Sequence, residues 1–162
     1  MELEDLAAQV GECLLARRLR LTTAESCTGG WVAQAITATP GCSQWFERGF
    51  VTYSNDAKME MLGVRPDTLA NHGAVSEATV REMAEGALAR SHGQVAVAVS
   101  GVAGPGGGSL EKPVGTVCLA WAGSGAPTQT RRVQLLGNRE AIRRQAVAAA
   151  LQGILDFLRG QP

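Results

Sequence analysis

A hydroxyl, a phenol and an amine lie within sixteen residues of one another in this chain, at Ser43, Tyr53 and Lys58. The chain has only two histidines, so the common base for an active serine is scarce. A lysine with a lowered pKa is able to take the proton of a serine hydroxyl in place of histidine. The spacing therefore suggests Ser43 as a nucleophile and Lys58 as its base, although both residue types also commonly occupy protein surfaces.

The segment ESCTGG, residues 25–30, joins an expected strand to an expected helix. Unpaired N–H groups at such a helix start bind a phosphate or a developing oxyanion. The candidate binding residues in this turn are Glu25, Ser26, Thr28 and Gly29. A thiol at this point would have a lowered pKa, which makes Cys27 an alternative nucleophile, although no histidine is evidently placed to serve it. Glu25 is equally well explained as a charge that satisfies helix-start amides.

A glycine-rich segment, Ser100 to Gly108, follows the apolar run Val95–Val99. Ligands of open α/β sheets sit at the carboxyl ends of strands, and glycines let backbone N–H groups approach an anion. The candidate binding residues here are Ser100, Gly101 and Gly104. The G-x-x-x-x-G-K-[ST] and G-x-G-x-x-G fingerprints are both absent, which disfavours ATP or dinucleotide binding. A flexible connection is the simpler alternative.

Three arginines, Arg139, Arg143 and Arg144, stand at the start of the last expected helix. Arg139 and Arg143 are four residues apart and therefore share a helix face. Such a pair is either solvated surface or a clamp for a phosphate or carboxylate. Arg139 and Arg143 are accordingly candidate substrate-binding residues.

The composition excludes several classes of protein. Fifteen basic residues balance fifteen acidic ones, which argues against a nucleic-acid partner. No segment approaches the roughly 18 continuous apolar residues of a membrane span, and the acidic start of the chain is unlike a secretory signal. The four cysteines form no C-x-x-C pair and lie at no metal-ligand spacing from histidine. We therefore expect a cytoplasmic protein with reduced thiols and no metal.

The hydrophobic spacing predicts strands that alternate with helices, and hence a layered α/β domain over residues 1–162. Expected helices begin near Leu3, after Gly30, after Ser76 and after Asn138, the last two residues being good N-caps. Asn71-His72-Gly73 is expected to form a turn. A strand is expected over Phe50–Tyr53, and two late strands, 114–122 and 128–136, follow each other directly. The sheet is therefore expected to be mixed and mostly parallel, with an antiparallel part.

Five motifs carry a family resemblance: TTAESCTGGWVAQAIT, PGCSQWFERGFVTYSNDAKMEMLGV, HGAVSE, VSGVAGPGGGSLEKPVGTV and NREAIRRQA. In this order they closely resemble the C-terminal domain of the CinA family of competence- and damage-inducible proteins. More specifically, the chain looks like the stand-alone bacterial members that act as nicotinamide-nucleotide amidohydrolases. The similarity runs from about Leu6 to Leu158.

The resemblance implies a three-layer α/β/α domain that hydrolyses the carboxamide of nicotinamide mononucleotide in pyridine-nucleotide recycling. The products would be nicotinate mononucleotide and ammonia. By motif position, the family's nucleophile falls on Ser43, its general base on Lys58 and its assisting tyrosine on Tyr53. No cofactor is implied, and we expect a homo-oligomer, most simply a dimer.

Two alternatives stay open at this point. The chain could be a nucleotide-binding regulatory module without catalysis. It could also hydrolyse a related nucleotide or pyrophosphate, but such chemistry normally recruits Mg²⁺ through clustered carboxylates, and the sequence shows no such cluster.

Overall fold

The computed structural model describes residues 2–161 and contains a five-stranded sheet of order β2-β1-β3-β4-β5. The strands are β1 Leu21–Glu25, β2 Phe46–Val51, β3 Val95–Gly101, β4 Thr116–Gly123 and β5 Ala126–Gln134. β1 pairs in parallel with both β2 and β3, whereas β4 pairs antiparallel with both β3 and β5. Only β4 therefore runs against the other strands, which confirms the expected mixed, mostly parallel sheet.

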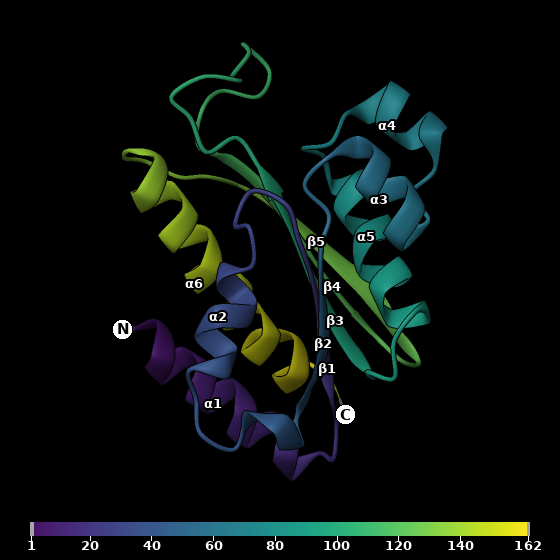
Figure 1. Cartoon of the computed structure of the whole chain (residues 1–162), viewed down its shortest axis with the longest axis vertical. Coiled ribbons are helices and arrows are strands. Elements are labelled where there is room, and N and C mark those ends of the chain that lie inside the picture. Colours follow the sequence, from purple (N-terminus) through teal and green to yellow (C-terminus); the bar gives the residue numbers. More distant parts are fainter. Residues whose placement is uncertain (1, 162) are drawn as a thin grey trace.

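Helices cover both faces of this sheet (Figure 1). One layer consists of α1 Leu3–Ala16, α2 Trp31–Thr37 and α6 Arg139–Arg159, and the other of α3 Asn55–Leu62, α4 Pro66–His72 and α5 Glu77–Ala89. β3 shows why two layers are needed. Its Val97 belongs to the core on the α1 and α6 side, and its neighbours Ala96 and Ala98 belong to the core on the α5 side. A strand that is apolar on both faces must be covered twice, and the three-layer α/β/α prediction is confirmed.

The two predicted helix caps are present. The Ser76 hydroxyl accepts the N–H of Thr79 at 3.1 Å, and the Asn138 side chain accepts the N–H of Ala141 at 2.9 Å. α4 was not predicted from the sequence, although it has proline at its first position, as helices favour. The turn expected at Asn71-His72-Gly73 is the end of this helix, and β2 begins four residues before the expected Phe50.

The chain connections bring three loops to one edge of the sheet. From β1 the chain crosses through α2 to β2, and from β2 it crosses back through α3, α4 and α5 on the opposite face to β3. The two crossovers diverge at β1, and ligands of open α/β sheets bind at such a point, beyond the carboxyl ends of the strands. The segments that follow β1, β2 and β3 meet at this edge.

Candidate active site

A cavity of about 290 Å³ opens at the carboxyl edge of the three parallel strands. Its walls come from the turn after β1, the segment between β2 and α3, the residues after α4, the glycine-rich loop after β3 and the start of α6. The lining residues are Ser26, Cys27, Tyr53, Lys58, Ala74, Val75, Ser100, Gly101, Val102, Ala103, Gly104, Gly106, Gly107 and Arg139. Most of the wall is backbone and small side chains, so chemistry there depends on few functional groups.

The amine of Lys58 has three neighbours, two carbonyls and one hydroxyl. Its Nζ lies 2.9 Å from the carbonyl oxygen of Thr52, 3.1 Å from that of Tyr53 and 3.0 Å from the Oγ of Ser26. A carbonyl only accepts, whereas a hydroxyl donates as well as accepts. The amine donates to the Ser26 oxygen, and the Ser26 hydroxyl in turn donates to the Tyr53 carbonyl at 3.4 Å. Once deprotonated to its neutral form, the amine is able to accept the Ser26 proton at this same contact.

Burial favours that neutral form. The Lys58 side chain is 1% exposed, and loss of water around the ammonium lowers the pKa of Lys58 below its ordinary value. None of the ion pairs formed within residues 2–161 includes Lys58. The geometry thus places a buried lysine amine with a lowered pKa in hydrogen-bond contact with a serine.

The register of β1 with its neighbouring strands holds Ser26 and Lys58 close together. The Ser26 N–H donates to the Val99 carbonyl at 3.0 Å, and the Thr52 N–H donates to the Glu25 carbonyl at 2.8 Å. These bonds continue the β1–β3 and β1–β2 ladders by one residue past the strands. Ser54 then caps α3 by accepting the Ala57 N–H at 3.0 Å, so Lys58 stands in the first turn of a helix that starts beside Ser26.

Ser43 lies at the amino-terminal end of the parallel strands, and the cavity lies at their carboxyl-terminal end. The prediction that Ser43 pairs with Lys58 is therefore wrong. Ser43 belongs to a short 3₁₀ helix, η1 Cys42–Gln44, which comes before β2, whereas Lys58 comes after it. The Leu21 N–H donates to the Trp45 carbonyl at 2.7 Å, which fixes η1 near the start of β1. Strand residues advance about 3.3 Å each, so β2 separates Ser43 from the cavity by roughly 20 Å. The hydroxyl beside Lys58 is that of Ser26.

Glu25 faces the start of α2 and does not line the cavity. One carboxylate oxygen accepts the Thr28 hydroxyl at 2.6 Å and the Val32 N–H at 2.9 Å, and the other accepts the Ala33 N–H at 3.1 Å. The side chain is 1% exposed. This is the simpler interpretation of Glu25, a charge satisfied by helix-start amides, and it replaces direct substrate binding.

Cys27 lines the cavity beside Ser26, but its thiol is poorly suited to attack. Burial, with a smaller contribution from the nearby Glu25 carboxylate, raises the pKa of Cys27 to about 11. The lowered pKa expected from the helix start is therefore wrong, because desolvation of the thiolate outweighs the helix-start amides. Cys27 stays protonated near neutral pH, which removes the support for it as the nucleophile.

The two candidate arginines, Arg139 and Arg143, lie at different places relative to the cavity. The side chain of Arg139 lines the cavity and donates to the Gly104 carbonyl at 2.8 Å. Arg143 instead borders a neighbouring hollow together with Thr28 and Gly29. Of the predicted binding residues, the structure brings together Ser26, Ser100, Gly101, Gly104 and Arg139, and it leaves Glu25, Thr28, Gly29 and Arg143 outside the cavity.

Sequence reasoning missed the wall formed by Ala74 and Val75. These small residues carry no chemical signal, and their position follows from α4, which was not predicted. Ser26 carried a usable signal, because it directly follows a predicted strand and precedes a glycine-rich helix start. Its pairing with Lys58 depends on β1 and β2 being neighbours.

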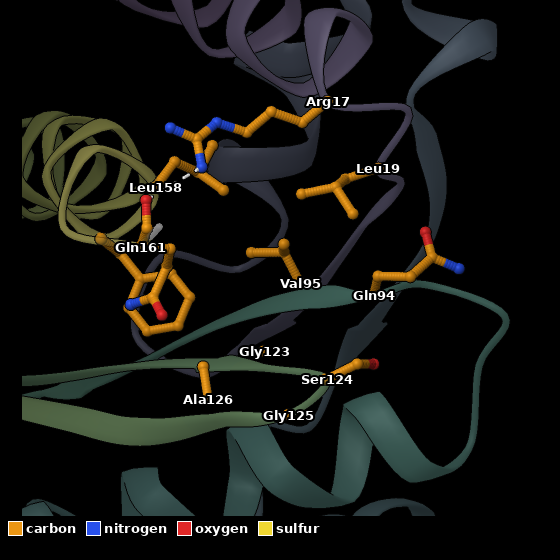
Figure 2. A pocket seen from close by; sticks show the side chains of 11 residues that line it. Arg17, Leu19, Gln94, Val95, Gly123, Ser124, Gly125, Ala126, Leu158 and Gln161 are labelled. Atoms are coloured by element: carbon orange, nitrogen blue, oxygen red, sulfur yellow. Dashed lines mark hydrogen bonds between the residues drawn. The ribbon is translucent and has the colours of Figure 1, made fainter.

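A larger cavity of about 570 Å³ lies at the other end of the sheet, where α1 and α6 end and β4 turns into β5 (Figure 2). Arg17 and Gln161 border it, and an Arg17 guanidinium nitrogen donates to the Gln161 carbonyl at 3.5 Å. Leu19, Val95 and other apolar side chains form much of its wall. The described residues that line it include no lysine and no histidine, so the smaller cavity is the candidate active site.

The described part of the chain has neither the side-chain cluster of a metal site nor a membrane-spanning helix. No group of three or more histidine, cysteine or acidic side chains there is placed to hold a metal ion. None of the helices within residues 2–161 has the length and apolar character needed to cross a membrane.

The fold and the site define a layered α/β protein with a buried serine–lysine pair at a strand switch point. Residues 3–158 match the CinA C-terminal domain, and the chain therefore belongs to that family. "Nicotinamide-nucleotide amidohydrolase PncC" of Escherichia coli K12 is 60% identical over 93% of this chain and 92% of its own length. The protein of the same name from Pseudomonas putida is 55% identical over 94% of each chain.

Solved structures agree with this assignment. The competence damage-inducible protein A from Klebsiella pneumoniae superposes with a TM-score of 0.96, at 44% identity over 100% of both chains. The competence/damage inducible protein CihA from Agrobacterium tumefaciens gives a TM-score of 0.93, at 46% identity over 97% of this chain and 95% of the other.

Proposed function

We propose that this protein is a nicotinamide-nucleotide amidohydrolase that converts nicotinamide mononucleotide and water to nicotinate mononucleotide and ammonia. The names of relatives at 55–60% identity support the substrate and the reaction. One observation carries the chemistry: a buried lysine amine lies 3.0 Å from the Ser26 hydroxyl, at the edge of a cavity. Ser26 takes the role that the sequence analysis gave to Ser43.

The proposed reaction has two halves. Neutral Lys58 takes the proton of Ser26 while its Oγ attacks the carboxamide carbon, because amides need an activated nucleophile. The tetrahedral intermediate then loses ammonia, with Lys58 returning the proton to the nitrogen. Water next attacks the resulting Ser26 ester with Lys58 again acting as base, which releases the carboxylate and restores the hydroxyl.

Backbone amides of the glycine-rich loop are the proposed donors to the oxyanion. Its Ala103 and Gly104 line the cavity, and one backbone donor to an oxyanion is worth about 10²–10³ in rate. Tyr53 stays a proposed assistant in proton transfer to the leaving ammonia. Its side chain is 63% exposed and lines the cavity, while its carbonyl holds Lys58.

The phosphate of the substrate is proposed to bind Arg139. The start of α6 brings this guanidinium to the cavity beside Gly104, and a guanidinium suits phosphate oxygens. We place the reaction in the cytoplasm, in keeping with four free cysteines. The expected homodimer stays a prediction that light scattering tests.

Ammonia release is the direct test of this function. Incubation with nicotinamide mononucleotide, with and without EDTA, should yield equal amounts of ammonia and nicotinate mononucleotide. Ser26→Ala should lower kcat by at least about 10³-fold, because it removes the attacking atom. Ser43→Ala should keep wild-type activity, and Cys27→Ala should lose at most a few-fold. No ammonia from the wild-type protein would favour the non-catalytic nucleotide-binding module, and a loss seen in Ser43→Ala alone would contradict the choice of Ser26.

A further inference from the structure

Arg143 contacts the turn that carries Ser26 from the side away from the cavity. Its Nε donates to the Cys27 carbonyl at 3.0 Å, and its Nη2 donates to the Thr28 carbonyl at 3.1 Å. These carbonyls belong to the two residues that directly follow Ser26. A bond to each fixes the path of the backbone as it leaves the serine.

A guanidinium suits this task because its N–H donors form a rigid planar fork, so one side chain holds two acceptors in a fixed relation. The same turn is held from the helix side by Glu25, whose carboxylate binds Thr28 and the first amides of α2. A buried anion and a half-buried cation from distant parts of the chain therefore hold one turn between them. Neither side chain lines the cavity.

The guanidinium of Arg143 is itself held in place. It stacks over the ring of Trp31, the first residue of α2, with 5.4 Å from Cζ to the ring centroid. Arg144 also lies over this ring, at 5.0 Å, and its other partner is the Glu140 carboxylate at 3.6 Å. Arg144 thus shares the tryptophan contact of Arg143 and lacks its two bonds to the turn, which makes it a matched control.

We propose that Arg143 is a positioning residue that keeps the Ser26 hydroxyl in contact with Lys58, and that it does not bind the phosphate. The role as a positioning residue rests on the proposed amidohydrolase function. A displacement of about 1 Å in a reacting group costs on the order of 10²-fold in rate. Loss of Arg143 should accordingly act on turnover rather than on substrate affinity.

The kinetic test compares Arg143→Ala with Arg144→Ala, using nicotinamide mononucleotide and ammonia release. We expect kcat of Arg143→Ala to fall about 10- to 100-fold with KM changed less than about threefold, and Arg144→Ala to behave as wild type. Millimolar guanidinium ion should restore part of the lost kcat in Arg143→Ala. A rise in KM at unchanged kcat would make Arg143 a substrate ligand, and equal losses in both variants would assign the effect to the Trp31 contact. Either result overturns the proposal.

A structural readout keeps the test independent of the reaction and of folding defects. The crystal structure of Arg143→Ala, or of Arg143→Lys if the alanine variant does not fold, should show residues 26–28 displaced and the Ser26–Lys58 contact lengthened. An undisturbed turn in that crystal would overturn the proposal even if the wild-type protein released no ammonia. Absence of ammonia release, with the turn displaced as expected, would contradict only the proposed function.

Discussion

The protonation state of Lys58 depends on the groups that surround its Nζ. A charged ammonium would have to leave water without gaining a carboxylate, and such burial is expensive in proteins. Two backbone carbonyls are enough to hold the two hydrogens of the neutral amine. The environment therefore keeps the lysine able to accept a proton, which surface lysines do only at high pH.

The first prediction concerns this proton. Because burial lowers the pKa of Lys58, the neutral amine should persist below about 10.4, the ordinary value for lysine. The proposed mechanism needs that neutral form, so kcat/KM should fall as the pH drops through the lowered pKa. Lys58→Arg should be as inactive as Lys58→Met across the whole profile, since a guanidinium keeps its proton. An arginine variant with more than half of the wild-type rate would show that Lys58 supplies only charge.

The second prediction concerns Arg139. If it binds the phosphate, Arg139→Ala should raise KM for the mononucleotide about 10- to 100-fold, as expected for loss of one charge-assisted hydrogen bond worth roughly 1.5–3 kcal/mol. KM for the phosphate-free riboside should stay nearly constant. Steady-state kinetics with both substrates check this, and Arg144→Ala is the control for loss of a cation from the same helix. Equal changes for both substrates would mean that Arg139 supports the glycine-rich loop through Gly104.

The residue types of the site could be predicted from the sequence, but the serine that contacts Lys58 was assigned wrongly. Lys58, Tyr53 and Ser26 were all named as candidates from the sequence, and all three line the cavity. Ser43 was favoured by its nearness to Lys58 along the chain and, separately, by its position in the family motif. Distance in space depends instead on β1 lying beside β2, so a serine thirty-two positions away is in contact while one fifteen positions away is not.

At the scale of elements, the turn between β1 and α2 connects stability with chemistry. Glu25 satisfies two helix-start amides of α2 and the Thr28 hydroxyl, and a carboxylate also suits the positive end of a helix. Ser26 is the next residue. The bonds that start the helix thus also hold the turn that carries Ser26, the proposed nucleophile.

The third prediction is that Glu25→Gln lowers the free energy of unfolding by about 1.5–3 kcal/mol. The amide nitrogen of glutamine places a donor either against the Ala33 N–H or against the Val32 N–H and the Thr28 hydroxyl, and the substitution removes the charge. Glu140→Gln in the first turn of α6 is the matched control, because Glu140 is exposed and such surface pairs contribute about 0–1 kcal/mol. Urea denaturation gives both values. Equal, small changes would mean that the Glu25 bonds add little to stability.

Elements with strong local signals were predictable, and those set by packing were not. Ser76 and Asn138 start their helices as expected because a cap is a property of three or four neighbouring residues. α4 and the first residues of β2 carry a weaker pattern. β2 is an edge strand with half-exposed residues, so it lacks the continuous apolar run that made β3 recognisable.

Across the whole molecule, the candidate chemistry lies at one end of the sheet and close helix–sheet packing extends to the other. The site occupies the carboxyl edge of β1, β2 and β3. Towards the opposite edge, α6 approaches β4 so closely that a Cβ on Gly153 would come within 2.0 Å of the Trp121 ring. That ring is 2% exposed, and its Nε1 donates to the Ala150 carbonyl at 3.1 Å. A core this tightly packed gives the strands that carry the site a fixed base.

The fourth prediction follows from this separation. In Gly153→Ala the new methyl group must displace Trp121, which its hydrogen bond holds in place. Overpacking of this kind costs about 1–3 kcal/mol, of which the better helix propensity of alanine returns about 1. We expect a net loss of up to about 2 kcal/mol in urea denaturation, with kcat and KM for nicotinamide mononucleotide unchanged well below the melting temperature. Gly160→Ala is the control, because its Cβ meets nothing closer than 3.5 Å, and it should leave stability nearly unaltered. A fall in kcat of the folded Gly153→Ala protein would show that strain at the far end of the sheet reaches the Ser26–Lys58 pair.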